Sequence, residues 1–289
     1  MKRIGLWLVL AIHVGFQLGG CVSTQSTAST GTPVISPAPS ESRQPRALKP
    51  PAEFAASIEF ARTMGALIYR HHRARQIAIT HLQHSATRRE DHWITEQVDG
   101  VGTVQVSLVE STATTPTESR ITSSLLVRDT HTQLPLRSVV TTLPRSLTDF
   151  ELAKLRAANV AMTIHAENNA ANIDAVVISW RRSGADVFYA YIVPAIQKLT
   201  PCAEAREVII DSAGTKVLAL RSLTSTCEQG ESSPHLLPIN MAATRDTPSP
   251  IDVFSSLYFA QPIHLRTTRN GMLWRIDGDQ ISLVNSDRM

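Results

Sequence analysis

The spacing of apolar residues predicts a long helix at the start of the folded part of the chain. Residues 52–84 contain one glycine, Gly65, and no proline. Apolar side chains recur there near the 3.6-residue period of a helix, at Phe54, Ile58, Ala61, Ile68 and Ile77. This period places them on one face, so we expect an amphipathic helix.

From Trp93 the pattern changes to the alternation that is typical of strands. Residues 93–98 and 103–109 flank Asp99-Gly100, a frequent hairpin turn. Residues 121–128 and 134–142 predict a second hairpin. Four antiparallel strands should therefore follow the helix.

The same succession then occurs again. Residues 147–167 return to a helical pattern, with Thr148 as N-cap and Glu151 completing a capping box. Two more hairpins follow, with strands expected at residues 174–180 and 187–193, and at 208–210 and 217–220.

The two blocks align without a gap at a constant offset of 84 residues. Gly100 falls on Gly184, and Leu136-Arg137-Ser138 falls on Leu220-Arg221-Ser222. Eight of the 52 positions from 91 to 142 are identical, which together with the repeated order favours an internal duplication. Two unrelated antiparallel sheets with similar turns are the alternative.

The expected fold class is α+β, with two units that each contain a helix and a four-stranded antiparallel sheet. The first unit spans residues 52–145, and the second spans residues 146–289 together with a C-terminal β-hairpin around Asp277-Gly278. Each helix would cover one face of its sheet, leaving the other face for solvent or for the other unit. Residues 228–250 are rich in Ser and Pro and predict a loop.

The first twenty residues have the pattern of a secretory signal. Two cations precede a short apolar run, which polar residues interrupt before Leu18-Gly19-Gly20-Cys21. The run is short for a membrane span, so a signal at residues 1–20 is favoured over a permanent helix.

The four residues from Leu18 to Cys21 resemble the lipobox of bacterial lipoproteins. The resemblance covers the signal only, and it implies cleavage after Gly20 and acylation of Cys21. Val22 is not the aspartate that marks inner-membrane retention in many such proteins, so the resemblance implies an outer-membrane lipoprotein facing the periplasm. An ordinary secretory signal with an incidental cysteine is the alternative.

Residues 21–51 should form a disordered tether that carries the acylated cysteine. The stretch is mostly Ser, Thr, Pro and Ala, and it cannot bury enough apolar surface to offset its chain entropy. Such a tether would hold the folded part away from the membrane, either as a plain spacer or as a binding segment.

The net charge of +3 and the pI near 8.9 do not indicate a nucleic-acid-binding protein. Five of the 28 Lys and Arg residues and one of the 25 Asp and Glu residues precede residue 51. The rest of the chain therefore has 23 basic and 24 acidic residues and is nearly neutral. Residues 60–89 nevertheless hold six arginines and four histidines with no carboxylate. We interpret part of this segment as a basic face for an acidic partner, formed by Arg70, His71, His72, Arg73 and Arg75. A solvated helix face that is balanced by acids elsewhere is the alternative.

Two cysteines remain once Cys21 is acylated. Cys202 and Cys227 lie nearly equidistant from the turn of the last predicted hairpin. In the oxidising periplasm an even pair predicts a disulfide.

No catalytic, metal-binding or cofactor motif is present in the sequence, which lacks G-x-S-x-G, H-E-x-x-H, P-loop and G-x-G-x-x-G patterns. Histidines at 71, 72, 81, 84 and 92 with Asp91 suggest a metal site, but the neighbouring arginines would repel a cation. Nothing in their spacing selects a catalytic pair among the carboxylates Glu96, Asp99, Glu167, Asp174 and Asp186. Ser138 and Ser222 carry no sign of a nucleophile.

The sequence therefore favours a membrane-anchored, non-catalytic module that binds an envelope protein. Two alternatives stay open, namely an immunity lipoprotein that neutralises a toxin and a hydrolase of an envelope polymer.

Overall fold

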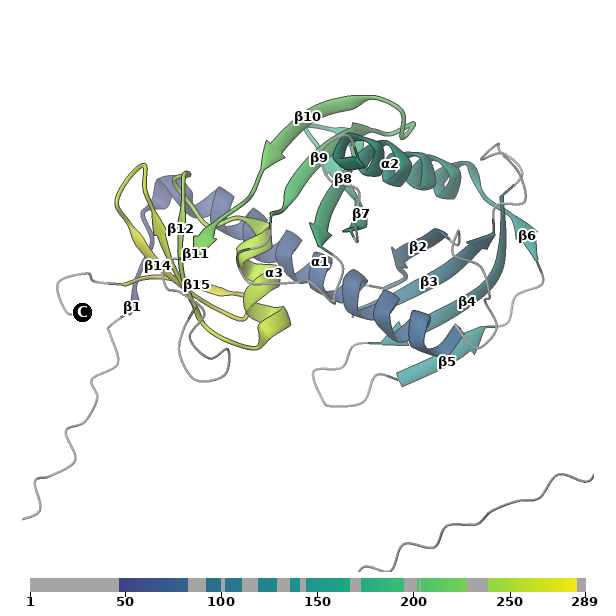
Figure 1. The fold of residues 1–289 in the computed structure, drawn as a ribbon, viewed down its shortest axis with the longest axis horizontal. Coiled ribbons are helices and arrows are strands. Elements are labelled where there is room, and N and C mark those ends of the chain that lie inside the picture. Colours follow the sequence, from purple (N-terminus) through teal and green to yellow (C-terminus); the bar gives the residue numbers. More distant parts are fainter. Residues whose placement is uncertain are drawn as a thin grey trace, which may run out of the picture. The chain divides into compact units, whose positions relative to one another are not determined.

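We analysed a computed structural model of the chain. It describes residues 47–82, 92–99, 102–110, 119–128, 136–140, 144–166, 173–194, 202, 204–227 and 239–284. These residues belong to one compact unit that contains three α-helices and three sheets, so the predicted α+β class is confirmed (Figure 1). The predicted signal, Cys21 and most of the predicted tether lie outside the described residues.

The predicted long helix is α1, Ala55–Leu82, preceded by a short 3-10 turn, η1, Ala52–Phe54. Its buried apolar residues recur at intervals of three, four or six and form one stripe, which includes Ile58, Ala61, Met64, Ile68, Ala74 and Ala78. Of the helices in the described part of the chain, none has both the length and the apolar character needed to cross a membrane.

The first sheet is a meander of four antiparallel strands, as predicted. Its strands are β2 His92–Gln97, β3 Thr103–Glu110, β4 Arg120–Arg128 and β5 Leu136–Val140, and the short β6 Arg145–Ser146 also pairs with β4. Helix α1 covers one face, where Ala74 and Ala78 pack against Val104, Val106 and Leu125.

The second helix, α2 Asp149–Ala166, begins with the predicted capping box. The Thr148 N–H donates to the Glu151 carboxylate at 2.8 Å, and the Glu151 N–H donates to Thr148 Oγ1 at 3.2 Å. The sheet that follows has the order β10-β9-β8-β7. Its strands are β7 Ile173–Arg182, β8 Ala185–Pro194, β9 Arg206–Asp211 and β10 Val217–Ser222.

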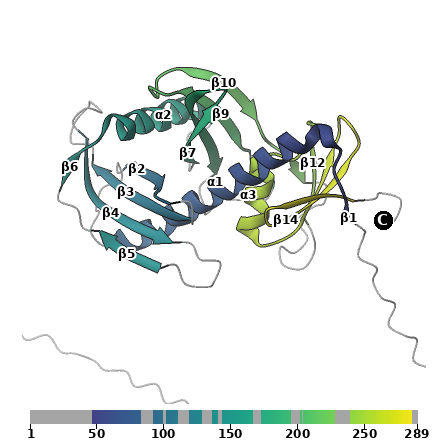
Figure 2. The same ribbon diagram turned by 180° about the vertical axis from the view of Figure 1, so that it is seen from behind.

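Helices cover both faces of this second sheet (Figure 1, Figure 2). On one face, Ala153 and Ala157 of α2 pack against Phe188 and its neighbours. On the other face, Met64 of α1 and Phe254 of a third helix belong to the same core as the second sheet. The second face of this sheet, which we expected to face solvent or the other unit, is thus covered by α1 and the third helix. Helix α1 reaches it because the helix is long enough to extend beyond the first sheet.

The element order repeats, whereas the strand register does not. The β2–β3 connection has five residues, 98–102, but β7 and β8 are joined by the two-residue turn Ser183-Gly184. Both turn residues have positive φ, 50° and 82°, which a tight hairpin turn requires. Turn length sets register, so Gln97 pairs with Val104, while its counterpart Arg181 pairs with Asp186.

A third sheet has the order β1-β15-β14-β13-β12-β11. Its strands are β1 Ala47–Leu48, β11 Thr226–Cys227, β12 Ile239–Ala243, β13 Ile263–Thr267, β14 Leu273–Asp277 and β15 Gln280–Val284. Strands β14 and β15 are the predicted C-terminal hairpin. Strands β12 and β13 run parallel, and the helix between them is α3, Pro250–Phe259.

Two segments differ from the expected loop and tether. Strand β12 lies inside residues 228–250, so the prediction of a loop there is wrong for residues 239–243. Strand β1 lies within the last residues of the expected tether, so the prediction of disorder is wrong for Ala47 and Leu48, which pair with Val284 and Leu283.

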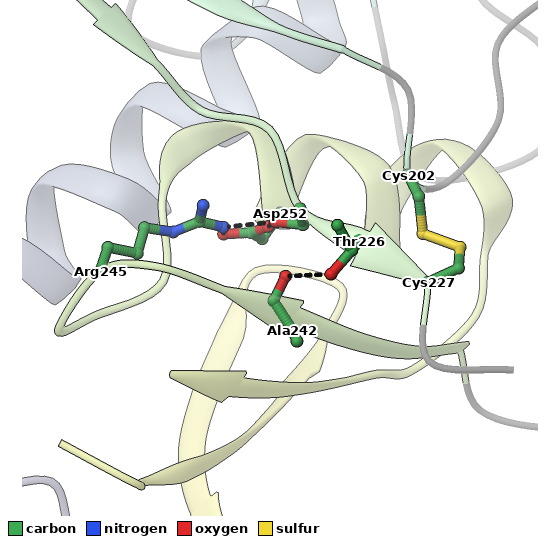
Figure 3. Close-up of a disulfide and its surroundings, with 7 residues drawn as sticks. Cys202, Thr226, Cys227, Ala242, Arg245 and Asp252 are labelled. Atoms are coloured by element: carbon green, nitrogen blue, oxygen red, sulfur yellow. Dashed lines mark hydrogen bonds and ion pairs between the residues drawn. A yellow bond between two sulfur atoms is a disulfide. The ribbon is translucent and has the colours of Figure 1, made fainter. Parts of the chain in front are cut away.

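The predicted disulfide between Cys202 and Cys227 is present, with a Cα–Cα distance of 5.7 Å (Figure 3). Cys227 lies in β11, next to Thr226, whose hydroxyl donates to the Ala242 carbonyl of β12. The bond therefore joins the segment that precedes β9 to the third sheet.

Candidate functional site

The basic segment of α1 does not form the exposed face that the sequence suggested. His71 and His72 are only 3% and 1% exposed, so the prediction of a partner-binding face is wrong for both. Arg75 pairs with Asp174 at 2.8 Å, and Arg73 donates to the Tyr69 hydroxyl at 2.6 Å. The physical reason is that α1 contacts two sheets and α3, so little of its surface is left for solvent.

Both histidines stay neutral at physiological pH. Burial, reinforced by Lys154 and Arg70, lowers the pKa of His71 to about 3, and its Nδ1 lies 2.8 Å from the Thr95 hydroxyl. Burial also lowers the pKa of His72 to about 4, and its ring packs edge-on against Phe254 at 5.4 Å. These residues are therefore core components that pair α1 with its neighbours.

A buried lysine, Lys154 of α2, lies beside the same threonine. Its ammonium donates to the backbone carbonyl of Thr95, and burial lowers its pKa to about 8, partly opposed by Glu96. A cavity of about 20 Å³ lies next to His71, Thr95 and Lys154. It is large enough for one water molecule but not for a ligand.

The described residues also contain a far larger depression, a groove of about 1170 Å³. Its walls come from residues 53–60 at the start of α1, residues 221–223 at the end of β10, and the loop 244–250. Four arginines line it, namely Arg182, Arg221, Arg245 and Arg269.

A buried carboxylate, Glu207 of β9, lies in this groove and holds one of the arginines. Glu207 accepts from the Tyr191 hydroxyl at 2.9 Å through Oε2 and from Arg221 at 3.3 Å through Oε1. Burial raises the pKa of Glu207 and that of Tyr191. Glu207 thus positions Arg221 at the rim of the groove.

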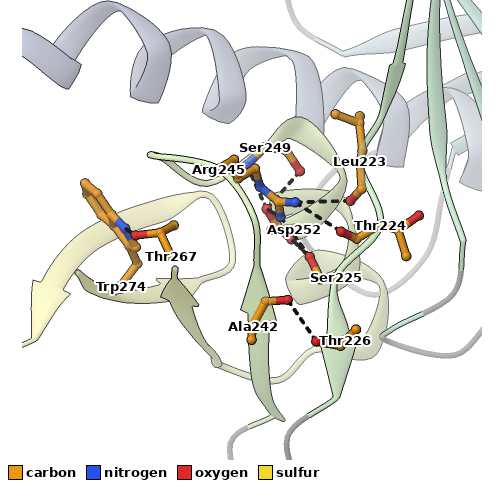
Figure 4. Close-up of polar contacts among 10 residues, drawn as sticks. All are labelled: Leu223, Thr224, Ser225, Thr226, Ala242, Arg245, Ser249, Asp252, Thr267 and Trp274. Carbon is orange, nitrogen blue, oxygen red and sulfur yellow. Dashed lines mark hydrogen bonds and ion pairs between the residues drawn. The ribbon is translucent and has the colours of Figure 1, made fainter. Parts of the chain in front are cut away.

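The opposite wall is fixed by Arg245 (Figure 4). Its guanidinium pairs with Asp252 and donates to Ser225 Oγ at 2.8 Å and to the Leu223 carbonyl at 3.3 Å. Asp252 also accepts from the N–H of Ser249 at 2.7 Å and thereby caps α3. This network ties the loop 244–250 to the chain that leaves β10. Sequence reasoning missed it, although Ser249 three residues before Asp252, with a proline between them, is a recognisable capping pattern.

Strand β10 forms an exposed apolar edge next to the groove. Leu218 and Leu220 are both 50% exposed, and β9 is the one described strand that pairs with β10. The turn before it is well defined, because Asp211 accepts from the N–H groups of Thr215 and Lys216 at 2.8 and 2.9 Å. These backbone hydrogen bonds lower the pKa of Asp211. The edge is thus an ordered surface that offers apolar side chains and backbone groups with which no second described strand pairs.

Among the remaining candidates that the structure describes, the carboxylates lie apart from one another. Asp174 pairs with Val193 and Asp186 pairs with Arg181 at the other end of the same hairpin, so about 23 Å separates the two carboxyl-bearing residues. Asp99 accepts from Thr103 and fastens the β2–β3 connection.

Other candidates are exposed, lie outside the described residues or do not converge. Glu96 and Ser222 are exposed. Glu167, His84, Asp91 and the side chains of Ser138 and His81 lie outside the described residues. Within the described ranges, no three or more His, Cys, Asp or Glu residues gather in a way that could hold a metal ion.

Comparison of the chain with protein-family models, with curated proteins and with solved structures finds no match.

Proposed function

We propose that this chain is an outer-membrane lipoprotein that faces the periplasm and binds another envelope protein without catalysing a reaction. The observation that supports the binding role is the exposed apolar edge of β10 beside the arginine-lined groove. Apolar edge strands are unusual on soluble surfaces, because they promote pairing with other chains. A retained edge of this kind is readily explained by a partner that covers it.

The anchor rests on the sequence and agrees with the cysteine chemistry. The signal and the lipobox resemblance assign acylation to Cys21. The disulfide between Cys202 and Cys227 suits an oxidising compartment such as the periplasm. Replacing Cys21 with serine should abolish labelling by an alkyne-tagged fatty acid and release the protein from the membrane fraction. Unchanged labelling would contradict the anchor.

Site-specific photo-crosslinking in cells tests the binding role. A photoreactive phenylalanine analogue would replace Leu220 in the full-length chain, and matched probes would replace Val98 and Phe150, which are also exposed and apolar. We expect one dominant protein adduct from position 220 and none from the two control positions.

Two outcomes of this experiment distinguish the proposed binding role from the proposed binding surface at β10. Absence of an adduct at all three positions, in cells where an established envelope pair crosslinks, would refute the binding role. Adducts from position 98 or 150 alone would keep the role and reject the β10 surface.

A further inference from the structure

We infer that the contact of α1 and α2 with β2 at His71 is an acid-sensitive switch, which opens when His71 is protonated. Opening would release the first sheet from both helices while the second and third sheets stay folded. The inference concerns a conformational change and does not depend on the proposed function.

The contact is centred on one threonine of β2, to which both helices bind. The Thr95 hydroxyl lies 2.8 Å from His71 Nδ1 of α1, and the Thr95 carbonyl accepts from the Lys154 ammonium of α2. All three residues are buried. Separation of β2 from the two helices would therefore bring water to His71.

The apolar contacts between the first sheet and the two helices are small. Helix α1 contributes two buried alanines, Ala74 and Ala78, and the partly buried Ile77 to one core cluster. Helix α2 contributes Leu155 to the other. Short side chains bury little apolar area, so the first sheet can separate from the helices at a lower cost than complete unfolding.

A protonated His71 would have no free carboxylate beside it among the described residues. Three cations lie close to its ring, namely Arg70, Arg75 and Lys154. Of the nearby acids, Asp174 of β7 already pairs with Arg75 at 2.8 Å, and Glu96 of β2 is exposed. An imidazolium in the closed contact would thus be a buried charge without a counter-ion.

The pKa of His71 gives the direction of the response. Burial lowers this pKa from 6.5 to about 3 in the folded protein. Between these values the open form binds a proton that the closed form does not, so opening becomes more favourable as the pH falls. From pH 7 to pH 5, the equilibrium constant for opening should rise about 25-fold.

The neighbouring His72 provides a matched control. Burial also lowers its pKa, to about 4, and its charged neighbours are Asp174 and Arg75. Its ring, however, packs edge-on against Phe254 and Tyr258 of α3, at 5.4 and 5.7 Å. Release of the first sheet would leave His72 against α3, so only complete unfolding would expose both histidines.

The test is hydrogen exchange of the purified full-length protein at pH 7 and pH 5, followed by mass spectrometry and corrected for the intrinsic exchange rate. Most carboxylates have a pKa of about 4, so histidines dominate the response in this range. In wild type, the amides of β2 to β4 should lose protection about 25-fold. At pH 5 the amides of β13 to β15 should remain at least about tenfold more protected than those of the first sheet.

Three variants locate the response. His71→Asn and His71→Gln keep a side chain that forms hydrogen bonds but does not titrate, so most of the change in β2 to β4 should disappear. His72→Phe keeps the ring contacts with α3 and should leave that change intact. Circular dichroism would verify that each variant is folded.

An undiminished loss of protection in folded His71→Asn or His71→Gln would overturn the role of His71. Wild type alone can refute the release of the first sheet, either by showing no loss of protection or by showing equal protection in all three sheets at pH 5. A smaller change in His72→Phe would also refute it, because the whole molecule would then be unfolding.

Discussion

Replacing the buried Lys154 with methionine should stabilise the protein and remove a specific pH dependence. The ammonium lies inside the fold, where the Thr95 carbonyl accepts its hydrogen bond. Methionine has a similar length and carries no charge, so it removes the cost of burying an ion while filling most of the same space.

The magnitude follows from the pKa of Lys154, which burial lowers from 10.5 to about 8. Below pH 8 the ammonium is protonated in both states, and the lowered pKa corresponds to a cost of about 3 kcal/mol to the folded state. Between pH 8 and 10.5 the unfolded chain binds more protons than the folded protein, so the free energy of unfolding rises with pH. At pH 10 we expect about 1 kcal/mol of the cost to remain.

Urea denaturation at pH 7 and at pH 10 would measure this effect in wild type and in Lys154→Met. The difference in unfolding free energy between the two proteins should shrink by about 2 kcal/mol over this range. Comparing the two proteins cancels groups that both share, including the neighbouring His71, Arg75, Glu96 and Asp174. Lys216→Met, at an exposed lysine, is the matched control and should show no such change. A difference that is the same at both pH values would refute the reasoning.

Four further predictions concern stability. Replacing Cys202 and Cys227 with serine should cost about 3 kcal/mol, because the bond closes a separation of 25 residues, and an unchanged urea midpoint would contradict this. Gly214→Ala should cost about 2 to 4 kcal/mol, because φ is 73° and the added Cβ would lie 1.9 Å from a backbone oxygen of α2. Gly184→Ala, at φ 82° in open space, should cost about 1 kcal/mol in thermal unfolding, and equal losses at both glycines would contradict the steric argument. Thr148→Ala removes the N-cap of α2 and should lower the free energy of unfolding by about 1 kcal/mol in urea denaturation. An unchanged free energy of unfolding would contradict the cap.

Local chemistry made much of the fold predictable. The Thr148 capping box, the Ser183-Gly184 turn and the Cys202–Cys227 pair each depend on a few neighbouring residues or on hairpin symmetry, and the structure contains all three. Strand β12 was not predicted, because it is short and lies in a segment rich in Ser and Pro, where residues typical of turns dominate the pattern.

The candidate site could not be predicted in the same way. Its groove combines residues near 55, 221 and 247, which only the tertiary fold brings together. The prediction of a basic partner-binding face on α1 failed for a related reason. The periodicity of a helix shows which residues share a face, but it does not show how many neighbours that helix has, and His71 and His72 face inward.

The length of α1 has a consequence for the order in which the chain can fold. The helix contributes Ile58 to the core of the third sheet, Met64 to that of the second and Ala74 to that of the first. Ile58 shares its core with Trp274, more than two hundred residues later, so the first turns of α1 are covered only after the last strands have been synthesised. Such long-range closure slows folding and couples the three sheets into one transition. A chain cut short before β14 would leave the start of α1 uncovered and prone to degradation.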